Sequence, residues 1–168
     1  MKSTFEIFKA ELMAELRLID SSTSVAYRTH VLDVRDDELP LSQCSKFPTL
    51  LVLFDAEKTV AVDSNLTVFD STVPVMVIGY IDRDADDAGV KTFKDSGEML
   101  IQDIKKVIVG ICKRHYARDP NYSRWKIDLK KYPIIASRPF AYLNNRSEIA
   151  VSFTAEILSQ PSTFIGLE

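Results

Sequence analysis

Residues 147–158 read SEIAVSFTAEIL, and apolar side chains occupy every second position of this stretch. In a β-strand, successive side chains point to opposite faces of the sheet, so residues two apart share a face. One face of this stretch is therefore apolar along its whole length, and it comprises Ile149, Val151, Phe153, Ala155 and Ile157. The alternation predicts an amphipathic strand that packs against a core on one side of a sheet.

Three further stretches predict other strands of the sheet, and PIIAS (133–137) and PFAYL (139–143) are short strand candidates. Residues 49–54, TLLVLF, form a β-rich apolar run; the DAEK that follows is typical of a turn, and TVAV (59–62) predicts a returning strand. Residues 66–81, LTVFDSTVPVMVIGYI, predict a long strand in which Pro74 implies an edge, a bulge or a break. The nearly continuous apolar run from Val73 to Ile81 indicates burial on both faces of that strand.

Two amphipathic helices are expected, one before and one after these strands. Ser3 and Glu6 match a capping box, and an apolar stripe at helical spacing then predicts a helix over residues 4–20. In the second helix, Asp95 is a candidate N-cap. The apolar faces comprise Phe5, Phe8, Leu12, Leu16 and Ile19 in the first helix, and Met99, Ile104, Val107, Ile108 and Ile111 in the second.

The predicted order is helix, several strands, helix, long connection and further strands. This order is typical of an α+β fold, here a mostly antiparallel β-sheet with two amphipathic helices packed on one face. A length of 168 residues predicts a single domain over 1–168. Residues 116–133 are largely polar and contain two prolines, so we expect an extended loop there, and a loose C-terminal tail at 159–168.

Composition and motifs argue against several classes of function. The net charge of −3 gives no whole-chain signal for nucleic-acid binding. The one C-x-x-H pair, Cys112 and His115, is half a zinc site at best, and the two cysteines of the chain form no disulfide framework. Because the common catalytic and phosphate-binding motifs do not occur, we predict no catalytic residue, metal or cofactor, and expect no enzyme. The N-terminus lacks the pattern of a signal peptide, and no apolar run reaches the length of a membrane span.

The acidic turn, defined as Asp82, Asp84, Asp86 and Asp87, places carboxylates at the spacing of a calcium loop. An EF-hand loop also requires glycine at its sixth position and glutamate at its twelfth, where this chain has Asp87 and Phe93. The preceding residues are typical of a strand rather than of an entering helix. We therefore expect a solvated connection between a strand and a helix, with weak surface binding of a divalent ion as the alternative.

The basic-aromatic segment, residues 113–131, has seven basic residues against two aspartates. It comprises Lys113, Arg114, Arg118, Arg124, Lys126, Lys130 and Lys131, interleaved with Tyr116, Tyr122 and Trp125. Such a mixture is typical of surfaces that stack bases and bind phosphates. The segment also complements the acidic turn, so an alternative is head-to-tail association of copies of the chain. A solvated loop with ordinary surface charges is the third interpretation.

Four stretches that follow the first helix show a familiar succession: FPTLLVLF (47–54), VPVMVIGYI (73–81), GEMLIQDIKKVIVGI (97–111) and EIAVSFTAEI (148–157). This succession resembles the tail terminator proteins of long-tailed bacteriophages, including the lambda-like group. The similarity is one of pattern and covers about residues 3–158. It implies a virion protein without catalytic activity, which forms a hexameric ring on the last ring of the tail tube. Such a ring stops polymerisation of the tube and presents a surface to the head or its connector.

The implied partners are further copies of the chain, the tail tube protein and a head–tail connector or neck protein. The resemblance implies that DNA passes through the ring without specific binding, that no membrane is involved, and that assembly occurs in the host cytoplasm. We expect the contacts to use the acidic turn together with Arg118, Tyr122, Arg124, Trp125 and Lys126. Deletion of residues 118–130 is then expected to abolish assembly without unfolding the domain. The alternatives are another neck or head-closure component, a nucleic-acid-binding module that uses the basic-aromatic segment, and an unrecognised small enzyme.

Overall fold

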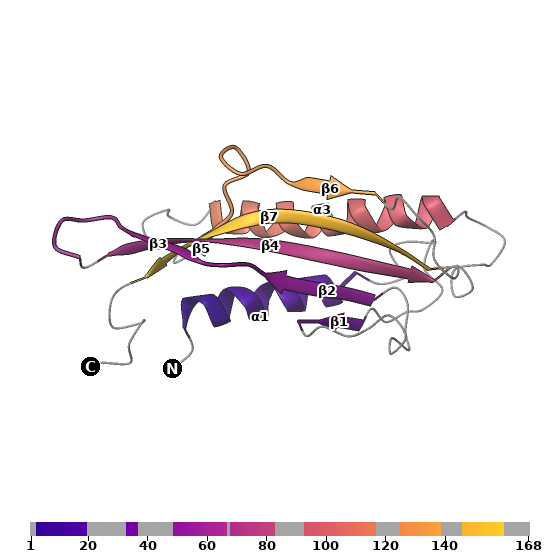
Figure 1. Cartoon of the computed structure of the whole chain (residues 1–168), viewed down its shortest axis with the longest axis horizontal. Coiled ribbons are helices and arrows are strands. Elements are labelled where there is room, and N and C mark those ends of the chain that lie inside the picture. Colours follow the sequence, from indigo (N-terminus) through magenta and orange to yellow (C-terminus); the bar gives the residue numbers. More distant parts are fainter. Residues whose placement is uncertain are drawn as a thin grey trace.

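A computed structural model describes residues 3–19, 33–36, 49–66, 68–82, 93–116, 125–138 and 146–159. Figure 1 shows how the helices and strands of these ranges are arranged. In chain order they are α1 (Thr4–Arg17), β1 (Asp33–Arg35), β2 (Thr49–Phe54), β3 (Lys58–Ala61), β4 (Phe69–Asp82), α3 (Phe93–Tyr116), β5 (Trp125–Lys126), β6 (Ile135–Ser137) and β7 (Arg146–Ser159).

The strands of the described ranges form one seven-stranded sheet, in which β1-β2-β4-β7-β5 are neighbours, β3 also pairs with β4, and β6 with β7. Every pairing is antiparallel except β1 with β2. The long pair β4–β7 runs in register from Phe69 opposite Ser159 to Asp82 opposite Arg146. The predicted α+β fold with a mostly antiparallel sheet is therefore confirmed.

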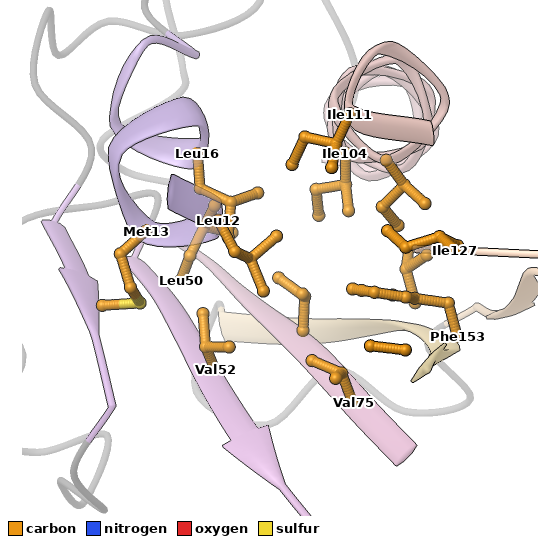
Figure 2. Close-up of a cluster of buried hydrophobic side chains, with 14 of the residues drawn as sticks. Leu12, Met13, Leu16, Leu50, Val52, Val75, Ile104, Ile111, Ile127 and Phe153 are labelled. Carbon is orange, nitrogen blue, oxygen red and sulfur yellow. The ribbon is translucent and has the colours of Figure 1, made fainter. Parts of the chain in front are cut away.

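Both helices lie on the same face of the sheet (Figure 2). Leu12 and Leu16 of α1 and Ile104 and Ile111 of α3 point toward the strands, and all four are fully buried. From the sheet, the alternating residues of β7 predicted above meet them, with Leu50 and Val52 from β2 among others. The hydrophobic core is thus one continuous cluster between two helices and one face of the sheet, which we call the inner face.

The capping box at the start of α1 is present as predicted. The Glu6 backbone N–H donates to Ser3 Oγ at 3.2 Å, and the Ser3 backbone N–H donates to Glu6 Oε2 at 2.7 Å. The expected cap of the second helix is wrong, because α3 begins at Phe93, so Asp95 lies within the helix.

Ser3→Ala is expected to lower the free energy of unfolding by about 1 kcal/mol, since it removes the side-chain acceptor of the first turn. Urea unfolding monitored by circular dichroism measures this loss. Ser64→Ala, at an exposed serine outside any helix, is the matched control and should leave stability nearly unchanged. Equal effects of the two substitutions would contradict the capping role.

Pro74 lies in the central strand β4 rather than in an edge strand. The Asp55 backbone N–H donates to the Pro74 carbonyl at 2.9 Å, and the N and C=O of one strand residue face the same neighbour. The nitrogen of Pro74 therefore faces the short gap between β2 and β3, and its missing N–H removes no bond to β7.

The prediction that residues 59–62 return alongside residues 49–54 is wrong, because β2 and β3 both pair with the same side of β4.

The prediction that the 73–81 run is buried on both faces is also wrong. Val73, Val75 and Val77 are buried on the inner face, whereas Pro74 is exposed and the Met76 side chain is 42% exposed. Even-numbered residues of β4 point away from the helices because side chains alternate along a strand. The sheet therefore has an outer face with apolar side chains that no described helix covers.

Candidate assembly surfaces

The expected loop at 116–133 is replaced in part by regular structure. Helix α3 continues to Tyr116, and Trp125 and Lys126 form β5, which pairs with Ile157 and Glu156 of β7. Residues 117–124, which include the predicted contact residues Arg118, Tyr122 and Arg124, lie outside the described ranges.

Trp125, a predicted contact residue, is a core residue whose ring is not exposed on the surface of the single chain. Its side chain is 4% exposed, and its ring centroid lies 5.0 Å from that of Phe8 and 3.6 Å from that of His115. Ile127, two residues later on the same face, is fully buried. The proposed deletion of 118–130 removes both side chains, so it is now expected to unfold the protein rather than to spare its fold.

Lys126 points to the outer face of the sheet and is bound to its own chain. Its Nζ lies 3.3 Å from Glu156 Oε2, and Lys131 Nζ donates to Glu156 Oε1 at 3.1 Å. The contact of Oε2 is an ion pair without the geometry of a hydrogen bond. Glu156 is buried, so the two ammonium groups supply the charge that compensates it.

Asp70 lies on β4, the strand next to the one that carries Glu156. Burial raises the pKa of the Asp70 carboxyl, and the Glu156 charge raises it to a smaller extent. The folded state therefore holds the Asp70 proton more tightly than the unfolded state does. Its contribution to stability is fully present below the unfolded pKa and is lost as pH rises through the folded pKa.

Asp70→Asn is accordingly expected to stabilise the protein at neutral pH, by less than about 1 kcal/mol because the site is partly solvated. The gain should vanish at acidic pH, where the carboxyl is protonated in both states. Urea unfolding of the two proteins at neutral and acidic pH measures this. A loss of stability at neutral pH, or a gain that persists in acid, would contradict the assignment.

The C-x-x-H pair is occupied by contacts within the chain. The Cys112 thiol donates to the Ile127 carbonyl at 3.0 Å, and burial raises the pKa of that thiol. His115 Nε2 lies 3.2 Å from Glu11 Oε1, and Arg114 binds Glu15 at 2.9 Å. These residues connect α3 to β5 and α1, and within the described ranges no group of three or more potential ligands gathers for a metal ion.

The acidic turn falls almost entirely outside the described ranges. Asp84, Asp86 and Asp87 belong to residues 83–92, and only Asp82 is placed, at the end of β4 opposite Arg146. The predicted complementarity between the acidic turn and the basic-aromatic segment therefore stays a prediction. Among the basic residues of the basic-aromatic segment whose side chains are described, Arg114, Lys126 and Lys131 are bound to carboxylates of their own chain.

The structure reveals a projecting segment that the sequence did not single out. We call residues 58–66 the β3 arm; it extends past the ends of both helices (Figure 1). All four residues of β3 are exposed, and three aliphatic side chains of the arm are 60–63% exposed: Val60, Val62 and Leu66. Exposed aliphatic residues gathered on a projecting element are typical of interaction sites.

The tip of the arm is a well-defined turn. The Val62 backbone N–H donates to the Val68 carbonyl at 2.9 Å, and Asp63 Oδ1 accepts from the Val68 N–H at 3.0 Å. Leu66 follows with φ of 55°, a left-handed conformation that costs a branched, bulky residue about 1–2 kcal/mol. The chain thus holds a leucine at an exposed position that glycine or asparagine would occupy with less strain.

A second apolar surface lies on the outer face of the sheet. Leu53, Met76, Ser152 and Ile135 stand opposite one another on β2, β4, β7 and β6, and we call this set the outer row. The Ile135 side chain is 60% exposed. Adjacent strands lie about 4.8 Å apart, so the backbones of Met76 and Ile135, which are two strands apart, are separated by roughly 10 Å. The small side chain of Ser152 lies between them. The outer row therefore crosses four strands, with Met76 and Ile135 exposed, Leu53 half-buried and the small polar Ser152 between Met76 and Ile135.

No protein-family model and no curated protein matches the chain. Neither helix in the described part of the chain has the length and apolar character needed to cross a membrane.

Proposed function

We propose that this chain is a structural protein of a phage virion, a tail terminator whose copies form a hexameric ring at the end of the tail tube. The observation that carries the proposal is the presence of two unlike exposed apolar surfaces on one chain, the β3 arm and the outer row. The order of secondary-structure elements, which resembles that of tail terminators, is consistent with it.

Two unlike surfaces on one chain favour a particular kind of assembly. A contact between identical patches gives a two-fold dimer, whereas a contact between different patches repeats head to tail and forms a ring or a filament. A closed ring of fixed size has no free subunit interface, and this is what a protein that ends a tube requires. In this proposal one side of the ring binds the tail tube protein and the other binds the connector, while DNA passes through the centre.

A role as a nucleic-acid-binding module has less support from the described residues than from the composition of the basic-aromatic segment. Three basic residues of the basic-aromatic segment are bound to carboxylates, and Trp125 is buried beneath α1 and α3, where no base can stack on it. Titration with single-stranded DNA at increasing salt tests this directly, because phosphate binding weakens steeply with salt. Tight, salt-dependent binding would favour the nucleic-acid module over the ring.

Negative-stain images of the purified, concentrated chain test the ring itself. A closed ring with a central channel is the expected result. Open-ended fibres or monomeric particles in every fraction would contradict a ring that terminates a tube by its own contacts.

A further inference from the structure

We infer that the β3 arm of one copy docks on the outer row of a second copy, and that this is the contact between subunits. The inference rests on the proposed function, which it deepens by naming the two surfaces that meet. Both surfaces are apolar and exposed in the isolated chain: Val62 and Leu66 on the arm, Met76 and Ile135 on the row. Contact between the β3 arm of one copy and the outer row of another would remove the apolar side chains of both surfaces from water.

The conformation of Leu66 indicates that the arm tip is built for contact. A turn that only reversed the chain would be more stable with glycine or asparagine at this left-handed position. A leucine there supplies an exposed aliphatic side chain in the turn of the arm, which is where a second copy would receive it. Strain at an exposed position of this kind is typical of binding sites.

The charges of the arm and of the segment that borders the outer row are opposite in sign, which favours contact between these two parts of different copies. Residues 55–66, which form the arm and its base, carry three acidic side chains and one basic one: Asp55, Glu57 and Asp63 with Lys58. Residues 125–138, which include β6 and border the outer row, carry four basic side chains and one acidic one: Lys126, Lys130, Lys131 and Arg138 with Asp128. Lys126 and Lys131 bind Glu156 and Arg138 binds Glu98, so part of this charge is compensated within the chain, and Lys130 remains exposed beside Lys131. Complementary charge of this kind steers an encounter and sets its orientation.

Two double variants separate the two surfaces. The arm variant carries Val60→Lys and Val62→Lys, and the row variant carries Met76→Glu and Ile135→Glu; all four positions are exposed, and a lysine at 60 faces Asp70 across the sheet, so the fold should survive. Ile7→Glu on α1 is the matched control, because Ile7 is 43% exposed and lies on the helical side of the molecule. Circular dichroism and urea unfolding verify that each variant is folded.

The expected result is that wild type and Ile7→Glu assemble, while the arm variant and the row variant are each monomeric. An equimolar mixture of the two variants should give a heterodimer and nothing larger, since it contains one intact arm and one intact row per pair. If the row variant assembles by itself, or if the mixture stays monomeric, the inference is overturned. If each variant assembles by itself, the inferred contact is wrong but the proposed ring is not contradicted. If the wild type is monomeric, both the inferred contact and the proposed ring are contradicted.

Leu66→Asn gives a second, independent test. The unfolding midpoint should stay or rise, because asparagine tolerates the left-handed conformation, while the dissociation constant of the assembly should rise by about tenfold or more. Unchanged assembly in a stabilised Leu66→Asn protein would overturn the role of the arm tip.

Discussion

Trp125→Ala is expected to lower the free energy of unfolding by about 3–5 kcal/mol, the range for removal of a large aromatic side chain from a core. The indole is almost completely buried and packs between Phe8 of α1 and His115 of α3. Its loss would leave a cavity where β5, α1 and α3 meet, and the neighbouring rings cannot fill that cavity without moving both helices.

Urea unfolding monitored by circular dichroism measures this effect, because Trp125 is the only tryptophan of the chain and the variant has lost its fluorescence. Lys130→Ala is the matched control, since Lys130 lies in the same segment and is exposed, and it should change stability by less than about 0.5 kcal/mol. If Trp125→Ala kept full stability and lost only assembly, Trp125 would be a partner contact and the position of β5 would be wrong.

Gly79→Ala is expected to destabilise the protein by about 1–3 kcal/mol through overpacking. A Cβ at this position would lie 2.6 Å from Leu100 Cδ2, closer than Cβ atoms approach other atoms in folded proteins, and 3.0 Å from Ile149 Cδ1, which is also a tight contact. Gly79 therefore lets α3 pack closely against the C-terminal part of β4, and an added methyl group would have to displace Leu100 of the helix.

Gly110→Ala is the control, and it is expected to raise the free energy of unfolding where Gly79→Ala lowers it. This glycine lies in the interior of α3, and nothing stands within 4 Å of an added Cβ. Alanine is favoured over glycine in a helix, so the variant should gain up to about 1 kcal/mol. Thermal or urea unfolding of both variants compares them. Equal effects at the two positions would show that α3 does not pack on Gly79 as described.

Local, periodic signals were sufficient for much of the fold. The capping box at Ser3, the apolar stripe of α1 and the alternation in 147–158 each depend on neighbours close in sequence, and the structure confirms all three. Pairing of β3 with β4 rather than with β2 depends on the three-residue gap after Phe54, which is a matter of tertiary structure and leaves no pattern in the sequence.

The errors about burial have a common physical origin. In 73–81, apolar composition was interpreted as burial, but Met76 lies on the outer face, where an apolar side chain can serve an interface instead of the core. Trp125 was placed in a polar loop because β5 is only two residues long. Its burial follows from pairing with Ile157 of β7, which is distant in sequence.

The candidate surfaces were harder to predict than the fold. The charged residues that the sequence emphasised are largely bound within the chain or lie outside the described ranges. Leu66, by contrast, is the first residue of a predicted strand, and its left-handed conformation follows from the turn that Asp63 closes. Exposed Val60 and Val62 have the alternation of an ordinary strand, so only the projection of the arm distinguishes them.

The molar mass in solution, measured by light scattering on a size-exclusion column across a range of protein concentrations, distinguishes a closed ring from a monomer. We expect one discrete species at about six times the monomer mass of 19.0 kDa, in equilibrium with monomer on dilution. A mass of 19.0 kDa at every concentration would contradict self-assembly through the β3 arm and the outer row.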